Sequence, residues 1–171
     1  MAFDLAYWLQ PALDTLHAYG LFFLLGSFTV ASLSDLRRMS AQSEFLHVWV
    51  LVAIALFALD VYQLQTGPFD LFAAKWGLAG ILSLLCYRRT GLIFKLAIGD
   101  VCAIIAVCGL LSPVMVIIFF VLLKFIDFVL HPTILKRFGQ GGAYPFMPVV
   151  AFATLASLPI DSFLRSLNLV F

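Results

Sequence analysis

Residues 95–105 read KLAIGDVCAII, a stretch in which a single acid, Asp100, lies among apolar residues. Apolar sequence of this kind is typical of a helix inside a membrane, where an ionisable side chain is costly and commonly marks a functional site. We therefore interpret Asp100 as a functional residue, and we expect another acid of the same kind to be its partner.

The composition of the whole chain is that of a membrane protein. Of its 171 residues, 64% are hydrophobic and 11% are charged, whereas about a quarter of a soluble domain is charged. No basic face or base-stacking motif is present, so we expect no nucleic-acid partner. The three cysteines lie in apolar runs without a Cys-x-x-Cys pair, and the three histidines have no ligand spacing, so we expect neither disulfides nor a bound metal. Residues 1–14 contain two acids and no basic residue, which is not the pattern of a signal peptide.

Six apolar runs are long enough to cross a bilayer core, which requires about 20 residues per helix. We expect transmembrane helices over about residues 16–35, 45–64, 71–87, 92–111, 114–130 and 145–164. The polar stretch 131–142 is expected to be the longest loop. The prediction is an all-α, polytopic membrane protein with a single six-helix transmembrane domain over residues 1–171.

The positions of the basic residues predict the orientation, because cytoplasmic loops carry the excess of Lys and Arg. With the amino terminus outside, the cytoplasmic helix ends carry seven of the ten cations: Arg37, Arg38, Arg88, Arg89, Lys95, Lys136 and Arg137. We therefore expect both termini on the outer side of the plasma membrane. Lys75 and Arg165 are interpreted as surface anchors. The small residues Ala73, Gly77 and Gly80 predict a closely packed helix face.

This orientation selects Asp35 as the partner of Asp100. Asp35 would lie at the cytoplasmic end of the first helix, and Asp100, five residues beyond Lys95, would lie about 7 to 8 Å deeper from the same face. Two carboxylates held close together do not both ionise cheaply, so such a pair shares a proton. One acid can then take a proton from an attacking water while the other donates a hydrogen bond to a peptide carbonyl, and no cofactor is needed.

The sequences SDLRR at residues 34–38 and IGD at residues 98–100 resemble the type IV prepilin peptidases and archaeal preflagellin peptidases. These are six-helix intramembrane aspartyl proteases with a Gly-x-Gly-Asp motif. The resemblance implies that Asp35 and Asp100 are the catalytic pair. It also implies that the substrate is the amino-terminal leader of a pilin-like or flagellin-like precursor, cleaved near the cytoplasmic face. Ala97 stands where the family has its first motif glycine, and Gly99 is expected to permit close approach by the substrate or by the facing helix.

Two further segments are candidates for substrate contact. Residues 145–148, PFMP, are similar to a proline-containing stretch that the family places close to the acids. Pro145 and Pro148 at a helix start are expected to leave backbone carbonyls free to pair with an extended substrate. Glu44, in a cytoplasmic loop, is a candidate contact for a basic leader, and residues 139–142, GQGG, are interpreted as a hinge that admits the substrate.

A second acid in the membrane leaves an alternative open. Asp127 lies in the helix expected over residues 114–130, and its spacing from Lys124 predicts an ion pair between them on one helix face. The alternative function is a small proton- or cation-coupled transporter that uses Asp100, Asp127 and Lys124. A purely structural subunit is less favoured because the intramembrane acids are costly.

Overall fold

The computed structural model describes residues 5–10, 15–38, 43–65, 67–138 and 145–168. These residues form seven helices: α1 (Leu5–Trp8), α2 (Thr15–Arg38), α3 (Ser43–Gln63), α4 (Phe69–Cys86), α5 (Ile98–Cys108), α6 (Pro113–Phe138) and α7 (Met147–Asn168). No strand occurs among these residues, and one isolated bridge joins Tyr87 to Leu96. The predicted all-α class is confirmed.

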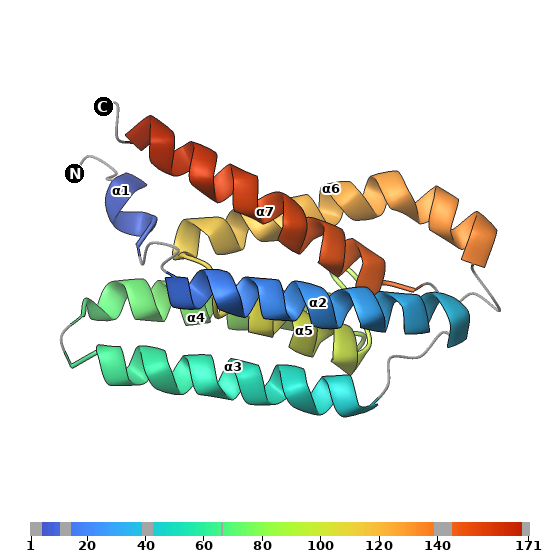
Figure 1. Cartoon of the computed structure of the whole chain (residues 1–171), viewed down its shortest axis with the longest axis horizontal. Helices are drawn as coiled ribbons and strands as arrows, with labels where there is room; N and C mark the ends of the chain where they lie inside the picture. The colour runs from blue at the N-terminus through green and yellow to red at the C-terminus, as the bar shows by residue number, and fades with distance from the viewer. Residues whose placement is uncertain (1–4, 11–14, 39–42, 66, 139–144, 169–171) are drawn as a thin grey trace.

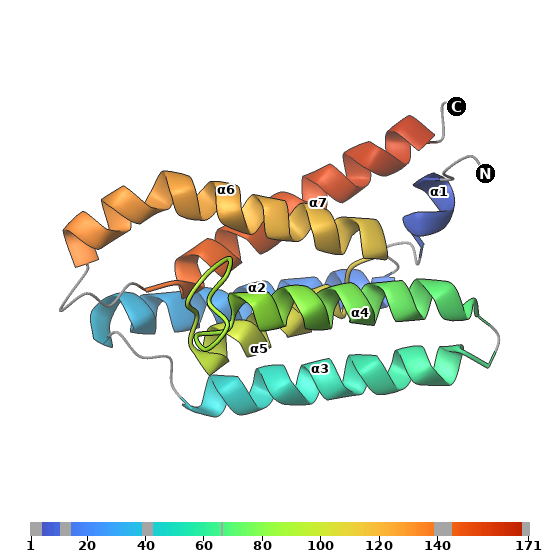
Figure 2. The ribbon, with the colours of Figure 1, turned by 180° about the vertical axis from the view of Figure 1, so that it is seen from behind.

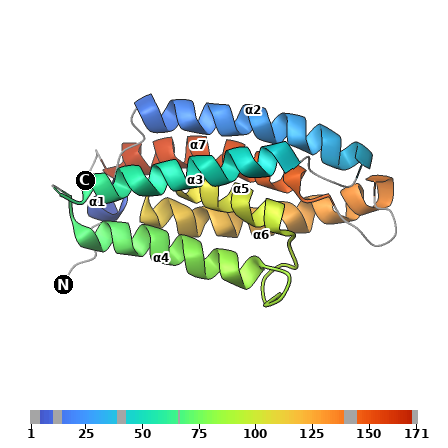
Figure 3. The same cartoon turned by 90° about the horizontal axis from the view of Figure 1, so that it is seen from below.

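The six longer helices form an elongated bundle with α5 at its centre. Figures 1 and 3 show α2, α3, α4, α6 and α7 around α5, which packs against α3, α4, α7 and α2. Its sequence, IGDVCAIIAVC, has apolar residues on all faces, as a helix buried on all sides requires. At one end of the bundle lie α1 and the turn from α3 to α4, and at the other lie the start of α5 and the end of α2 (Figure 1). Asp35, near the end of α2, and Asp100, near the start of α5, therefore lie at this second end.

Five helices, α2, α3, α4, α6 and α7, are long and apolar enough to cross a membrane. With its 11 residues, α5 is only about 16 Å long, about half the thickness of a bilayer core. The chain therefore has the character of a multi-pass membrane protein, with a short apolar helix inside a group of longer ones.

The fourth helix predicted over residues 92–111 is wrong in its extent, because residues 92–97 are not helical. The amides of Leu92 and Ile93 donate to the Leu85 carbonyl, and the Leu96 amide donates to the Cys86 carbonyl. Gly91, with φ of 53°, makes the turn that returns the chain to the end of α4. The apolar residues before α5 thus satisfy their backbone groups on a neighbouring helix end.

The long loop predicted over residues 131–142 is also wrong in part. Residues 131–138 continue α6, which includes Pro132 within its length. A proline removes one backbone donor from a helix, and the residues after it are helical all the same. Lys136 and Arg137 in the last turn suit the negative end of the helix dipole. The proposed GQGG hinge lies outside the described residues.

Small residues pack closely at a different place from the one predicted. Ala73, Gly77 and Gly80 on α4 are exposed, and a Cβ added at either glycine would meet nothing within 4 Å. A Cβ on Gly109, at the end of α5, would lie 3.0 Å from Leu56 Cδ1 and 3.2 Å from Trp76 Cη2. One close approach in this bundle is therefore between the end of α5 and its neighbours α3 and α4, and another lies at Gly20 of α2, where a Cβ would be 2.9 Å from Leu110 Cδ2.

We expect Gly109→Val to lower the free energy of unfolding by about 1–3 kcal/mol, because the added atoms overpack the contact with Leu56 and Trp76. Thermal unfolding in detergent micelles measures the change. Gly77→Val is the matched control, since its side chain would enter open space and should have little effect. Equal loss of stability in the two variants would contradict this packing.

Candidate active site

Asp35, near the end of α2, binds the start of α7. Its carboxylate is buried, with 8% of the residue exposed, and Oδ2 accepts a hydrogen bond of 3.4 Å from the Met147 amide. The amide of Phe146 donates to the same carboxylate. The first amides of a helix have no partner within the helix, so an acid placed there satisfies them and meets the positive end of the dipole. Asp35 therefore caps α7 from a helix that is distant in sequence.

Asp100 has the corresponding place at the start of its own helix. Ala97, in extended conformation, is the N-cap of α5, and Asp100 is the third helical residue. The Ala97 amide acts electrostatically on the Asp100 carboxylate, which stands at the position of the acidic residue in a capping box. An acid in the first turn also meets the positive end of the helix dipole, so Asp100 has a structural role of its own.

The structure places these two acids at the same end of the bundle. They are near enough for the charge of Asp35 to act on the Asp100 carboxylate, and α2 contacts α5. Figure 1 shows that the last turns of α2 and the first turns of α5 and α7 lie at the same end of the bundle. The depth calculated from Lys95 does not apply, since residues 95–97 are not helical, but the loop returns Asp100 to the same end.

Of the residues expected around the two acids, Ala97 and Gly99 are accessible, whereas Pro145 and Pro148 are buried. A Cβ on Gly99 would meet nothing within 4 Å, and Ala97 is exposed. The expectation that a facing helix approaches Gly99 is therefore wrong, whereas the position is open to another molecule. Pro145 and Pro148 are buried. Between them, the Phe146 carbonyl accepts hydrogen bonds from two amides of α7, so this carbonyl is not free for a substrate.

Glu44 lies in the first turn of α3 and is exposed. An acid at this position stabilises the helix through its dipole. The start of α3 lies at the same end of the bundle as the acid pair (Figure 1). Glu44 is therefore available at that surface, although no hydrogen bond or ion pair joins it to Asp35 or Asp100 in the described structure.

The ion pair predicted between Lys124 and Asp127 is wrong. Asp127 Oδ1 lies 3.7 Å from Nδ1 of His131, one turn further along α6. Lys124 Nζ instead donates to the Ile93 carbonyl at 3.5 Å and lies 4.7 Å from the centre of the Phe94 ring. The loop that carries these partners was predicted as helix, which is why the sequence could not reveal the contact.

Sequence reasoning missed the amides of Phe146 and Met147 as partners of Asp35. The signal for them is the helix start marked by Pro145 and Pro148, since such a start leaves amides unpaired. Ser32, one turn before Asp35, was also missed. It is 8% exposed, and its hydroxyl has no hydrogen-bond partner within the part of the chain that is described. This hydroxyl is a second polar group close in sequence to the acid.

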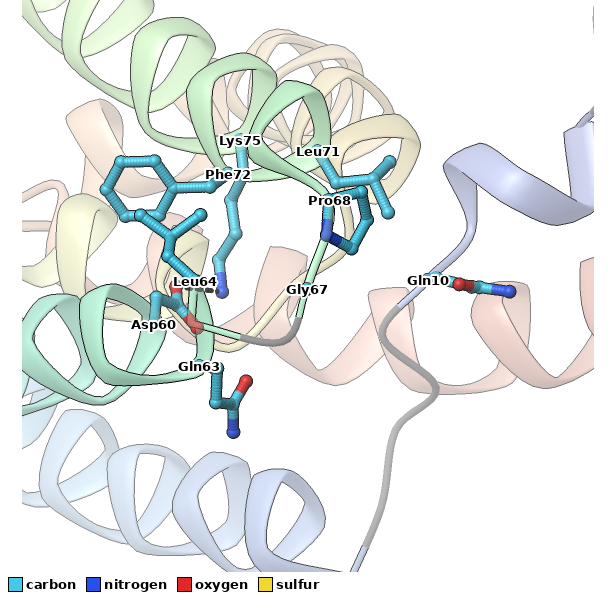
Figure 4. Close-up of a pocket in the computed structure, with 9 residues that line it drawn as sticks. All are labelled: Gln10, Asp60, Gln63, Leu64, Gly67, Pro68, Leu71, Phe72 and Lys75. Atoms are coloured by element: carbon cyan, nitrogen blue, oxygen red, sulfur yellow. Dashed lines mark hydrogen bonds and ion pairs between the residues drawn. The ribbon is translucent and has the colours of Figure 1, made fainter.

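A separate polar cluster lies beside the turn from α3 to α4, at the opposite end of the bundle. Figure 4 shows Asp60 and Lys75 in a pocket of about 140 Å³. Asp60 Oδ2 accepts a hydrogen bond of 2.7 Å from Lys75 Nζ, and another of 2.7 Å from Trp76 Nε1. Lys75 is only 3% exposed, so its interpretation as a surface anchor is wrong. The prediction for Lys75 failed because the sequence of one helix does not reveal an acid on the next. Arg165 pairs with Asp161, four residues earlier on α7, with 2.8 Å between its Nε and Oδ2.

Metal ligands do not gather in the described ranges, where no three His, Cys, Asp or Glu residues could hold an ion. Cys86, Cys102 and Cys108 are free thiols.

The chain was compared with models of protein families, with curated proteins and with solved structures, and none of these comparisons found a match. The resemblance to the prepilin and preflagellin peptidases stays a prediction from the residues that carry it.

We expect Lys75→Met to destabilise the protein by about 3–5 kcal/mol, because Asp60 would keep a charge in a largely buried position without its partner. The loss is measured by thermal unfolding in detergent micelles. The double variant Asp60→Asn, Lys75→Met removes both charges and should recover much of the stability. If the double variant is as unstable as the sum of the two single variants, the ion pair does not have this role.

Proposed function

We propose that this protein is an intramembrane aspartyl endopeptidase in which Asp35 and Asp100 form the catalytic pair. The observation that carries the proposal is that Asp35 and Asp100 lie at the same end of an apolar bundle, both at helix starts. Asp35 accepts a hydrogen bond from the first amide of α7, and Asp100 is in the first turn of α5, where the charge of Asp35 acts on it. Amides at a helix start hold a carboxylate in a defined direction, which is the preorganisation that an acid pair needs for catalysis.

The reaction proposed is hydrolysis of a peptide bond by an activated water. The ionised acid takes a proton from the water as its oxygen attacks the carbonyl carbon, and the protonated acid donates a hydrogen bond to the carbonyl oxygen. Breakdown of the tetrahedral intermediate then transfers a proton to the leaving amine. The two acids titrate as one unit, so the proton belongs to the pair and not to either residue alone. This chemistry uses the side chains of the chain itself and a water.

The proposed substrate is the amino-terminal leader of a pilin-like or flagellin-like precursor. The open position at Gly99 and the exposed Ala97 support access for an extended peptide beside Asp100. Glu44 is an exposed acid at the same end of the bundle, which suits a basic leader. The basic residues at predicted cytoplasmic helix ends support a plasma-membrane protein with this site near the cytoplasmic face.

The alternative transporter has less support. It requires Asp100, Asp127 and Lys124 to act together, and no hydrogen bond or ion pair joins any two of these described residues. Lys124 binds the loop before α5, and Asp127 binds His131. In this arrangement Lys124 and Asp127 each contact a different partner and not each other, which does not favour an exchange of a proton or a shared cation among the three groups.

We expect Asp35→Asn and Asp100→Asn each to reduce cleavage of a prepilin-like or preflagellin-like precursor by at least about 1000-fold, because each removes one member of a unit. Asparagine retains an acceptor for the helix amides, so folding should be preserved. Appearance of the processed precursor in proteoliposomes is the readout, and Asp127→Asn is the control that should cleave normally. Full activity of both variants would overturn the proposal. Proton-driven uptake abolished by Asp100→Asn and spared by Asp35→Asn would favour the transporter.

We expect Gly99→Val to lower kcat/KM for the precursor by about 10- to 100-fold, because the side chain would enter the space proposed for the substrate and displace it from the acids. Thermal stability should change little, since a Cβ at this position meets no atom of the protein within 4 Å. Kinetics and unfolding measured on the same preparation separate the two effects. Unchanged kinetics would show that the substrate does not pass this residue.

A further inference from the structure

The loop between α4 and α5, residues 87–97, connects the end of α4 to the helix that carries Asp100. It folds back on α4 through amides of Leu92 and Ile93 that donate to the Leu85 carbonyl, while the Leu96 amide donates to Cys86. The loop rises from the end of α4 toward α6 and α7 (Figure 2). Its last residue, Ala97, caps α5, so a displacement of the loop displaces the first turn of that helix.

Phe94 joins this loop to the segment that binds the other acid. Its ring lies edge-on to the Phe146 ring, with 5.2 Å between the centroids, and the two residues are 8% and 3% exposed. Phe146 directly precedes Met147, the donor to Asp35. The contact between the Phe94 and Phe146 rings therefore connects the loop that precedes Asp100 with the segment whose amides bind Asp35.

Lys124 on α6 is in contact with the other part of this loop. Its ammonium lies 4.7 Å from the centre of the Phe94 ring and 3.5 Å from the Ile93 carbonyl oxygen. Its charge also reaches Cys86 at the end of α4. A cation in a membrane-spanning helix is costly unless it has partners, and those that the described residues provide are on the loop. Lys124 is an exposed residue, and attraction to the ring face and to the carbonyl oxygen favours this position of its ammonium.

We infer that Lys124 is a positioning residue that holds Phe94 against Phe146 and thereby sets the separation of Asp35 and Asp100. The effect of Lys124 on the rate of cleavage rests on the proposed function, whereas its effect on the separation of Asp35 and Asp100 does not. Lys124 touches neither acid in this arrangement. It acts through the loop on Asp100 and through Phe146 on the amides that hold Asp35.

The inference is tested first by the distance between the two acid-bearing segments. Nitroxide labels at Ser34→Cys and Ala97→Cys, in a chain whose Cys86, Cys102 and Cys108 are replaced by Ala, report this distance and leave both acids intact. We expect Lys124→Met to broaden the distribution of distances. Lys124→Arg should preserve it, because a guanidinium also stacks on an aromatic ring and donates to a carbonyl. Lys136→Met, which removes an exposed cation from the last turn of the same helix, is the matched control.

Cleavage kinetics provide the second readout. We expect Lys124→Met to lower kcat by about 10- to 100-fold with little change in KM, because misplacement of reacting groups slows the chemical step. Lys124→Arg should restore kcat. Phe94→Leu should lower kcat by a similar factor. Adding Lys124→Met to Phe94→Leu should lower kcat little further, since both changes remove the same contact between Lys124 and Phe94.

The outcomes separate this inference from the proposed function. A distance distribution in Lys124→Met as narrow as that in Lys136→Met would overturn the positioning role, whatever the rate of cleavage. Equal broadening in Lys124→Met and Lys124→Arg would also overturn it. A broadened distribution that Lys124→Arg reverses, in a protein that cleaves no precursor, would support the positioning role and contradict the peptidase proposal.

Discussion

Unpaired amides at helix starts are the constraint on which this arrangement depends. In an apolar environment each unsatisfied backbone group costs several kcal/mol, because no water is present to bind it. Asp35 binds amides at the start of α7, and Asp100 stands in the first turn of α5, where its charge meets the positive end of the helix dipole. Since both helices begin at the same end of the bundle, capping them brings two carboxylates into one place. The polar site therefore arises from the requirements of the apolar fold.

The carboxylates of Asp35 and Asp100 therefore have two roles. They stabilise helix starts, and they are the proposed catalytic groups. Loss of an N-terminal cap costs about 1 kcal/mol, and asparagine caps a helix about as well as aspartate. Replacement of the carboxylate by an amide thus removes the charge and the shared proton while it retains an acceptor for the helix. The Asp→Asn variants can therefore test the proposed chemistry without removing the helix caps.

The class of fold and the choice of Asp35 and Asp100 followed from apolar run lengths and the placement of cations. The course of residues 92–97 did not, because these apolar residues match a helix in sequence and bind the end of α4 instead. Residues 131–142 were interpreted as a loop, although α6 continues through Pro132 to Phe138. The partners of Lys75 and Lys124 lie on other elements, and spacing within one helix carries no information about them.

The central claim is that Asp35 and Asp100 are one pair that shares a proton, and infrared spectroscopy of carboxyl groups near neutral pH tests it most directly. A protonated carboxyl has a carbonyl band distinct from that of a carboxylate. We predict one such band in the unmodified protein, altered in frequency or intensity both in Asp35→Asn and in Asp100→Asn, because a proton shared by two acids responds to the loss of either one. The band should be unchanged in Asp127→Asn. A band that is unchanged in either of the first two variants, or no band at all, would contradict the shared proton.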